Sequence, residues 1–416
     1  MAKLIERKIY TDSIKGFFDN GEFIKVITGV RRSGKSGILK LVMQEALKHT
    51  NKDHIIFLDF EDYSNSDLLK PKVLHQYVLD KIKDDKTYFV FLDEIQKVEE
   101  WESVVASLRK RNTDIYITGS NAQLLSGEFA TNIAGRCVSF SVYPLSFREF
   151  FRFRVESGFK KYLEPTSFPV DESHLDEFVK VGGFPALSTK DYSDDEIRRV
   201  VTDIHSTAVL KDVVERNKIK NVPLLQRIIA YLYDNVGNLT SIKKIVDYLQ
   251  KEKVDFETVS SYIGYLENAF IINKVSRYDI KGKKLLESNY KFYLADHSLQ
   301  YAIREIREDN KPGILENIVY NELIRRGYKV YVGKMSKDDS REIDFVAEKN
   351  NGDEKVYVQV CYEFTTPETK EREYAPLLDV KDHFPKYVVS YKLFGKDGRN
   401  GVVGIQLKDF LLKESF

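Results

Sequence analysis

The sequence has little that would suit a secreted or membrane-spanning protein. Of its 416 residues only two are cysteines, Cys137 and Cys361, so a disulfide framework is not expected and a reducing compartment fits better. No apolar run approaches the roughly 20 residues of a membrane span. The first ten residues carry charges where a signal peptide is apolar. We therefore expect a cytoplasmic protein without a membrane partner.

The sequence also lacks an excess of charge of either sign. It has 65 basic and 64 acidic residues, for a net charge of +1, so contact with nucleic acid would have to come from a local patch. The seven histidines are scattered, with no zinc-ligand spacing and no readable Ser-His-Asp grouping. What the chain does have is 42% apolar residues, enough for buried cores in two or three domains.

The first 145 residues alternate between apolar runs and segments with helical spacing. Helices are expected at 35–47, from Pro71 onward and at 101–110. Strands are expected at 23–28, 55–60, 88–94, 115–120 and 137–142. Such alternation is typical of crossover units, and it predicts an α/β fold with a parallel sheet covered on both faces.

After Pro144 the pattern changes. Residues 146–235 are mostly of helical character, broken at GGFP (182–185). Within 222–295, three helical segments and a hairpin that turns at Gly282 are the parts of a winged helix. The remaining residues predict a helix at 314–326, strands at 328–333, 342–348 and 355–363, and a charged, solvated helix within 365–387.

A phosphate-binding loop follows the first predicted strand. The pattern G-x-x-x-x-G-K-[ST] is matched between a strand and a helix, the context that this motif requires. Lys35 is expected to pair with the β- and γ-phosphates of a nucleotide, and Ser36 to ligate Mg²⁺. Backbone N–H groups would surround the phosphates. The predicted nucleotide-binding residues are Gly29, Val30, Arg31, Arg32, Ser33, Gly34, Lys35, Ser36 and Gly37.

An acidic pair ends the third predicted strand, in FVFLDE. Carboxylates at that end of a parallel strand face the crevice where α/β proteins bind ligands. Asp93 is expected to hold Mg²⁺, and Glu94 to orient and polarise an attacking water. The two acids follow the loop by about 60 residues, and the pairing of the two motifs predicts a nucleoside triphosphatase. The cofactors expected are ATP and Mg²⁺, although no motif excludes GTP.

Two further segments are candidates for the same chemistry. In Thr118-Gly119-Ser120-Asn121 a polar side chain could reach the γ-phosphate or the water, although the segment would also suit an ordinary polar loop. Arg136, just before the fifth strand, is a candidate arginine finger for a neighbouring subunit. An ion pair at the strand edge is the alternative. The side chains of Arg31 and Arg32 are expected to face solvent or a partner.

Several motifs together resemble one known family. They are GVRRSGKS, FLDEIQ, ITGSNAQLL, GR before a strand, YPLSFREF, GGFP and YDIKGKK, in this order. The chain is similar, over nearly its whole length, to prokaryotic AAA+-like ATPases of the archaeal type in the STAND-related branch, which carry a C-terminal domain of unknown function.

The resemblance implies four regions. These are a P-loop ATPase core at 1–145, a helical lid and connector at 146–221, a winged helix at 222–298, and a domain related to restriction-endonuclease-like nucleases at 299–416. It also implies that Ser120 or Asn121 is the first sensor and that Arg136 is the candidate for the finger, alongside the assignments already made for Lys35, Ser36, Asp93 and Glu94.

The expected winged helix is not well suited to reading DNA sequence. Its third helix, 256–270, has no lysine or arginine and carries Glu257 and Glu267. The basic residues lie in the hairpin instead, where a wing at 274–284 could touch phosphates non-specifically. They are Lys274, Arg277, Lys281, Lys283 and Lys284. A solvated hairpin or an inter-domain packing module is the alternative.

The last domain lacks one residue that a restriction-like nuclease needs. Glu316, Asp344 and Gln359 stand where metal ligands would be, and they predict a weak second metal site. The position of the catalytic lysine holds Cys361, and Lys349 or Lys355 would have to replace it. The fold would then serve as a binding platform, without strand cleavage.

Three functions remain open at this level. The first is an Mg²⁺-dependent ATPase that acts as a nucleotide-driven switch. The others are an ATP-dependent nuclease or DNA-processing protein, and a slow-turnover module that binds an unknown protein partner. A homo-oligomer that completes its sites with Arg136 in trans is compatible with the first.

Overall fold

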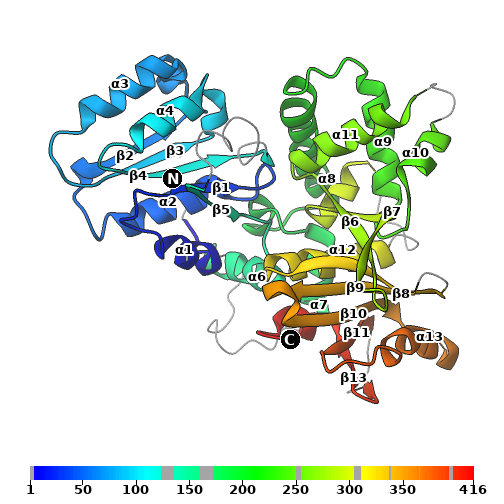
Figure 1. The fold of residues 1–416 in the computed structure, drawn as a ribbon. Helices are drawn as coiled ribbons and strands as arrows, with labels where there is room; N and C mark the ends of the chain where they lie inside the picture. Colours follow the sequence, from blue (N-terminus) through cyan, green and yellow to red (C-terminus); the bar gives the residue numbers. More distant parts are fainter. Residues whose placement is uncertain are drawn as a thin grey trace. The chain divides into compact units, whose positions relative to one another are not determined.

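The computed structural model describes residues 4–122, 135–158, 172–249, 254–303, 311–336, 339–364, 366–392 and 397–416. The chain divides into two compact units (Figure 1). The first comprises residues 1–144 with 268–270, and the second comprises 145–267 with 271–416. Among the described residues, no helix combines the length and the apolar character needed to cross a membrane.

The first unit is built on a five-stranded parallel sheet. Its strands are β1 (Ile24–Thr28), β2 (Ile55–Asp59), β3 (Tyr88–Asp93), β4 (Thr113–Gly119) and β5 (Cys137–Ser141). Their order in the sheet is β2-β3-β4-β1-β5, and every pairing is parallel. The five predicted strands and the parallel sheet are therefore confirmed, with ends that differ by at most two residues. This is the sheet expected of a P-loop AAA+ core.

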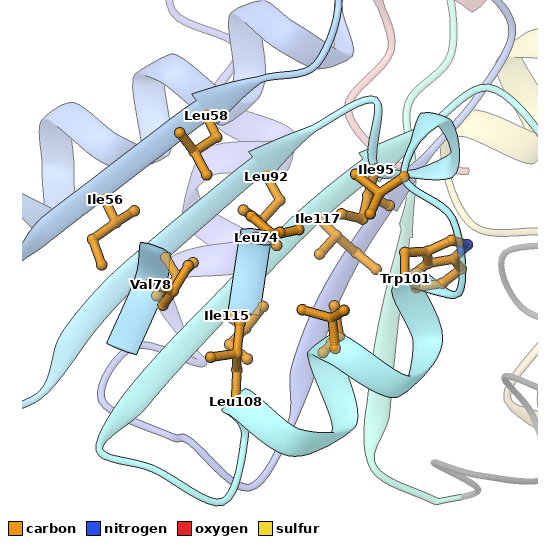
Figure 2. Packing of buried hydrophobic residues seen from close by; sticks show 14 of the residues in the cluster. Ile56, Leu58, Leu74, Val78, Leu92, Ile95, Trp101, Leu108, Ile115 and Ile117 are labelled. Atoms are coloured by element: carbon orange, nitrogen blue, oxygen red, sulfur yellow. The ribbon is translucent and has the colours of Figure 1, made fainter. Parts of the chain in front are cut away.

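Helices cover both faces of this sheet. On one face, α3 (Pro71–Lys81) and α4 (Trp101–Leu108) pack against β2, β3 and β4 through a cluster that includes Leu74, Leu92 and Trp101 (Figure 2). On the other face, α2 (Lys35–Ala46) and α1 (Lys8–Lys15) pack against Phe91 and Tyr116. Proline occupies the first turn of α3, as expected. Helix α1 was not predicted from the sequence.

The second unit begins with helices. They are α6 (Phe147–Glu156), α7 (Glu172–Val181), α8 (Asp194–Thr207), α9 (Val222–Asp234), α10 (Ile242–Tyr248) and α11 (Phe256–Asn268). Capping boxes begin two of them: Ser146 with Glu149 at α6, and Ser193 with Glu196 at α8. The helical character predicted for this region is thus confirmed in its described part. A π-helical stretch, Ala208–Glu215, continues α8 and was not predicted.

An eight-stranded sheet forms the rest of the second unit. Its strands are β6 (Ile272–Asp279), β7 (Lys284–Leu294), β8 (Lys329–Ser336), β9 (Asp339–Lys349), β10 (Glu354–Glu363), β11 (Lys386–Lys392), β12 (Asp397–Arg399) and β13 (Val402–Gln406). The order is β12-β13-β11-β10-β9-β8-β6-β7. The predicted hairpin, β6–β7, is present, and β6 pairs in parallel with β8. The hairpin therefore extends the sheet of the C-terminal residues.

Three helices accompany this sheet. They are α12 (Lys311–Arg325), α13 (Pro367–Leu378) and α14 (Leu407–Leu412). Tyr374 and Leu377 of α13 pack into an apolar cluster with strand residues that include Ile343 and Val388. Tyr320 of α12 stacks on Tyr293 of β7, with ring centroids 4.6 Å apart. The helix predicted within 365–387 is confirmed as α13.

A partly buried histidine, His205, makes the second unit sensitive to acid. The ring of His205 on α8 lies edge-on to Tyr233, and burial lowers the pKa of His205 to about 4. The unfolded imidazole titrates near 6.5, so below that pH the unfolded chain binds a proton that the folded chain does not. Stability conferred by a neutral His205 is present above pH 6.5 and is lost as the pH falls toward 4.

We expect the replacement His205→Phe to reduce the pH dependence of unfolding. Between pH 7 and pH 5 the free energy of unfolding should fall in both proteins. The fall should be about 2 kcal/mol larger in the parent than in the variant. Urea denaturation followed by circular dichroism at the two pH values measures this difference. His383→Phe, at an exposed position of the same unit, is the control. An unchanged pH dependence in His205→Phe would contradict the assignment.

Candidate functional site

The loop between β1 and α2 has the geometry of a phosphate cradle. Gly29 has φ +147°, and a Cβ atom there would lie 2.1 Å from the carbonyl oxygen of Val142, so only glycine fits. Gly34 precedes α2 with φ +101°, again in the left-handed region. The helix then starts at Lys35, which directs its free N–H groups and its positive end toward the loop. The predicted strand–loop–helix context is thus present.

Lys35 is held inside this loop. Its side chain is only 4% exposed, and Nζ donates to the carbonyl oxygens of Gly29 at 3.1 Å and Val30 at 3.2 Å. The same atom lies 3.8 Å from Oε1 of Glu94. The ammonium group therefore stands between the loop and the acidic pair, where a polyphosphate would be neutralised.

Asp93 and Glu94 lie at the carboxyl end of β3 and are 1% and 7% exposed. The hydroxyls of Thr118 and Ser36 bond to the Asp93 carboxylate. Burial raises the pKa of Asp93 and outweighs the lowering effect of these two hydroxyls. Glu94 adopts a left-handed backbone conformation, and its Oε2 accepts a hydrogen bond from Gln96.

The residues present fit a nucleotide with Mg²⁺. The buried hydroxyls of Thr28 and Ser33, beside the cradle, have no hydrogen-bond partner in the described part of the chain. Mg²⁺ usually takes one or two carboxylates together with phosphate oxygens and waters, and Asp93 and Ser36 are in contact. No protein-only cage is needed, and the described residues contain no group of three acids, histidines or cysteines arranged for a metal ion.

The sensor candidates lie beside this pair. Ser120 and Asn121 directly follow β4, the strand between β3 and β1, and both are buried. Because all strands are parallel, their carboxyl ends share one edge with the loop and the acids. The structure therefore brings the predicted sensors, Lys35 and the acidic pair to one edge of the sheet.

The two loop arginines differ in their surroundings. The guanidinium of Arg31 lies 3.4 Å from a carboxylate oxygen of Glu61, and its side chain is 13% exposed. Arg32 is exposed and has φ +66°, a conformation that only a few per cent of non-glycine residues adopt. The expected outward orientation thus suits Arg32, whereas Arg31 is engaged within its own unit.

Arg136 lies at the opposite end of the sheet, where the parallel strands begin. It precedes β5, and its carbonyl oxygen accepts a hydrogen bond from Ile24 at the start of β1. The five residues of β1 separate this end from the loop by about 16 Å, at about 3.3 Å per residue. Its side chain is exposed. Arg136 therefore does not belong to the site of its own chain.

Sequence reasoning missed Arg7, which braces the loop. The side chain of Arg7 is buried and donates to the carbonyl oxygens of Ser33 and Tyr143, both at 2.9 Å. Its guanidinium also lies 4.6 Å from the ring centre of Tyr10. Arg7 follows Glu6 in a short charged segment near the start of the sequence, which by itself does not reveal a partner.

Some basic residues of the hairpin are exposed, and another contacts an aromatic ring. Lys281, Lys283 and Lys284 at the hairpin tip are exposed. Lys274 lies instead over the ring of Tyr290, 4.5 Å from its centre. The tip is closed by Asp279, whose carboxylate accepts from the N–H of Gly282 at 2.8 Å.

Two of the three residues of the predicted second metal site, Glu316 and Asp344, lie around a lysine instead. Lys291 of β7 is 4% exposed, and its Nζ lies 3.0 Å from Glu316, 2.9 Å from Glu342 and 2.9 Å from Asp344. The nearby carboxylates raise the pKa of Lys291 well above its usual value, against the effect of burial. An ammonium group, not an open ligand set, occupies the centre of this cluster.

The side chain of Gln359 is also engaged away from this centre. Its oxygen accepts from the backbone N–H of Asp344 at 3.2 Å, and its amide nitrogen donates to Glu373 at 3.0 Å. The candidate lysines do not supply a catalytic ammonium either. Lys349 lies over the ring of Tyr328, and Lys355 lies near Glu348. Burial raises the pKa of the Cys361 thiol to about 12, which leaves it protonated.

Comparison with known proteins assigns the chain to a family. A family model described as an AAA domain matches residues 21–151, and a domain of unknown function (DUF8612) matches residues 172–310. An uncharacterized protein of Haemophilus influenzae is 39% identical over 417 residues, with 99% of each chain covered. An uncharacterized protein of Methanocaldococcus jannaschii is 33% identical, over 84% of this chain and 77% of that protein. The chain belongs to this family of AAA+-like P-loop ATPases.

Solved structures that resemble this chain are more distant. The ORC1 protein of Aeropyrum pernix, in complex with DNA, gives a TM-score of 0.35 at 12% identity, covering 73% of this chain and 93% of that one. AMPPCP-bound DnaA from Aquifex aeolicus gives 0.30 at 15% identity, covering 62% and 86%.

Proposed function

We propose that this AAA+-like ATPase binds and hydrolyses ATP with Mg²⁺ and uses hydrolysis as a switch. The observation that carries the proposal is the meeting of Lys35, Asp93 and Glu94 at one sheet edge, with Lys35 Nζ 3.8 Å from the Glu94 carboxylate. A bound Mg²⁺ would supply charge neutralisation at the phosphates, and Ser36 and Asp93 would hold it.

Each side chain of the site then has a role that its position supports. Lys35 binds the terminal phosphates, and the loop amides and the start of α2 orient them. Glu94 takes the position of the residue that orients and activates water. Ser120 or Asn121 contacts the phosphate that leaves. Because these groups are buried, their charges interact more strongly with a bound nucleotide than they would in bulk water.

We further propose that the site is completed by a second copy of the chain. Arg136 is exposed and about 16 Å from its own loop, so an arginine finger at this position would have to act on the nucleotide of another subunit. The lid and connector (146–221), the winged helix (222–298) and the C-terminal domain (299–416) would respond to the state of that interface.

A secondary role in DNA contact rests on the exposed lysines of the hairpin tip. Lys281, Lys283 and Lys284 could bind phosphates without reading bases. Nuclease activity is not part of the proposal, because Lys291 fills the carboxylate cluster and the thiol of Cys361 stays neutral.

The test is ATP turnover over a range of protein concentrations, with and without duplex or single-stranded DNA. We expect turnover per subunit to rise with concentration. An equimolar mixture of Arg136→Ala and Glu94→Gln proteins should recover activity that neither has alone, since one supplies Glu94 and the other Arg136. Stimulation by DNA that is lost in Lys281→Ala/Lys283→Ala/Lys284→Ala would support the wing. No recovery in the mixture would refute the trans arrangement.

A further inference from the structure

Thr118 occupies a central place in the ATPase core. It lies near the carboxyl end of β4, paired in register with Ile27 of β1, and Ile117 beside it pairs with Leu92 of β3. The strand that leads to the phosphate loop and the strand that leads to the acidic pair are thus its two neighbours. Its side chain is completely buried.

The hydroxyl of Thr118 makes one contact to each acidic residue. It donates to Oδ1 of Asp93 at 2.5 Å, and it accepts the backbone N–H of Glu94 at 2.8 Å. A single oxygen atom therefore fixes the carboxylate of one acid and the main chain of the next. This buried hydroxyl resists rotation, because rotation would leave a buried polar group without a hydrogen-bond partner, which is unfavourable.

The backbone of Glu94 needs such a restraint. Its φ of 55° and ψ of 47° are left-handed, a conformation that is unfavourable for an L-residue. This conformation turns the Glu94 side chain so that Oε1 lies 3.8 Å from Lys35 Nζ while Oε2 accepts from Gln96. Without the bond to Thr118, the Glu94 N–H would be buried and unpaired, and a different backbone conformation would become favourable.

We propose that Thr118 is a positioning residue of the ATPase site. Its hydroxyl holds Asp93 in the orientation that receives the metal ion and holds Glu94 in the one that faces the phosphates. This inference rests on the proposed function. Thr118 itself needs no contact with nucleotide or metal. The hydroxyl is required and the methyl group is not, so serine should substitute for Thr118 and valine should not.

The chain offers a matched control on the same strand. Thr113, at the amino end of β4, is 2% exposed, and its hydroxyl donates to the carbonyl oxygen of Leu108 at 2.8 Å. Thr113→Val therefore deletes the same chemical group from an equally buried position, at the end of the strand away from the loop. General weakening of the sheet would affect both valine variants, whereas loss of positioning would affect only Thr118→Val.

Two measurements separate this inference from the proposed function. The first is hydrogen exchange, by mass spectrometry, of peptides covering residues 88–97 in nucleotide-free protein. Thr118→Val should lose protection there, while Thr118→Ser and Thr113→Val should not. This result does not depend on whether the protein hydrolyses ATP.

The second measurement is Mn²⁺ binding by electron paramagnetic resonance, in the presence of a non-hydrolysable ATP analogue, together with kcat and KM. Thr118→Val should weaken Mn²⁺ binding and lower kcat by about 10–100-fold, as loss of a residue that orients a metal ligand does, with nucleotide affinity in EDTA unchanged. Thr118→Ser should keep Mn²⁺ binding and kcat close to those of the parent, because it retains the hydroxyl.

The inference is overturned if Thr118→Val keeps parental exchange and Mn²⁺ affinity, or if Thr118→Ser loses as much as Thr118→Val. Equal losses in Thr113→Val would also overturn it, since the effect would then come from the strand as a whole. If the parent protein neither binds the Mn²⁺–nucleotide complex nor turns over ATP, the proposed function fails. The exchange experiment alone then decides whether Thr118 restrains the acidic pair.

Discussion

Glu94→Gln protein is expected to bind ATP as tightly as the parent and to turn it over about 10²–10⁴-fold more slowly, so that ATP stays bound. The amide keeps the size of the side chain and can still contact Gln96, but it cannot accept a proton from water. The variant also removes a negative charge 3.8 Å from Lys35, which favours the ammonium–phosphate contact. Filter binding of labelled ATP and phosphate release measure the two quantities.

Glu99→Gln is the control for this variant. Glu99 lies five residues further along the chain and is exposed, so the same change there should leave turnover within about twofold of the parent. Hydrolysis by Glu94→Gln at the parental rate would contradict the role assigned to Glu94. Loss of ATP binding, with hydrolysis lost as a consequence, would point to a structural role instead.

Lys291→Met is expected to destabilise the second unit by about 3–5 kcal/mol. Methionine has a similar volume but leaves the carboxylates of Glu316, Glu342 and Asp344 facing one another without the ammonium that now lies 2.9–3.0 Å from each. Burial already raises the pKa of Glu316 to about 8, which reflects how poorly this position tolerates a carboxylate. Urea denaturation followed by far-ultraviolet circular dichroism measures the change.

Lys284→Met tests whether the position or the residue type matters. Lys284 is on the same strand as Lys291 but is exposed, so its replacement should change stability by less than about 0.5 kcal/mol. The chain has a single tryptophan, Trp101, buried in the first unit, and its fluorescence reports that unit separately. Equal stability of Lys291→Met and the parent would show that the cluster contributes no net stability.

The ATPase core could be predicted because its signals are local in sequence. Apolar runs alternate with helical spacing, and the loop and the acidic pair each occupy a few consecutive residues at strand ends. Since parallel strands share one carboxyl edge, predicting the strands was enough to bring Lys35, Asp93 and Glu94 together. The short N-terminal helix α1 and the role of Arg7 were not predicted. A single buried arginine produces no pattern in the local sequence, so nothing there indicated the contacts of Arg7.

The role of Thr118 depends on strand order, which the sequence does not contain. The residue belongs to a segment that was considered for contact with phosphate, and only the neighbours of β4 show that it faces Asp93 and Glu94. The same is true of Lys291. Lys291 stands between aromatic residues in NYKFYL, but its three carboxylates lie 25, 51 and 53 residues away in the sequence.

The sheet to which the hairpin belongs could not be predicted, for a different reason. A hairpin turning at Gly282 was predicted and was interpreted as part of a winged helix. The parallel pairing of Arg277–Asp279 with Val332–Lys334 adds them to a sheet whose other strands come much later in the chain. An unpaired strand edge favours such pairing, but the sequence of the hairpin does not indicate which strand will pair with it.

The central claim is tested most directly by equilibrium binding of ATP with Mg²⁺ to the parent protein and to Lys35→Ala, by isothermal titration calorimetry. The account predicts saturable binding by the parent, one nucleotide per chain, and a loss of at least about tenfold in affinity for Lys35→Ala, because a charge-assisted contact to phosphate is removed. Lys48→Ala, an exposed change just beyond α2, should bind as the parent does. Absent binding by the parent, or equal binding by Lys35→Ala, would contradict the account.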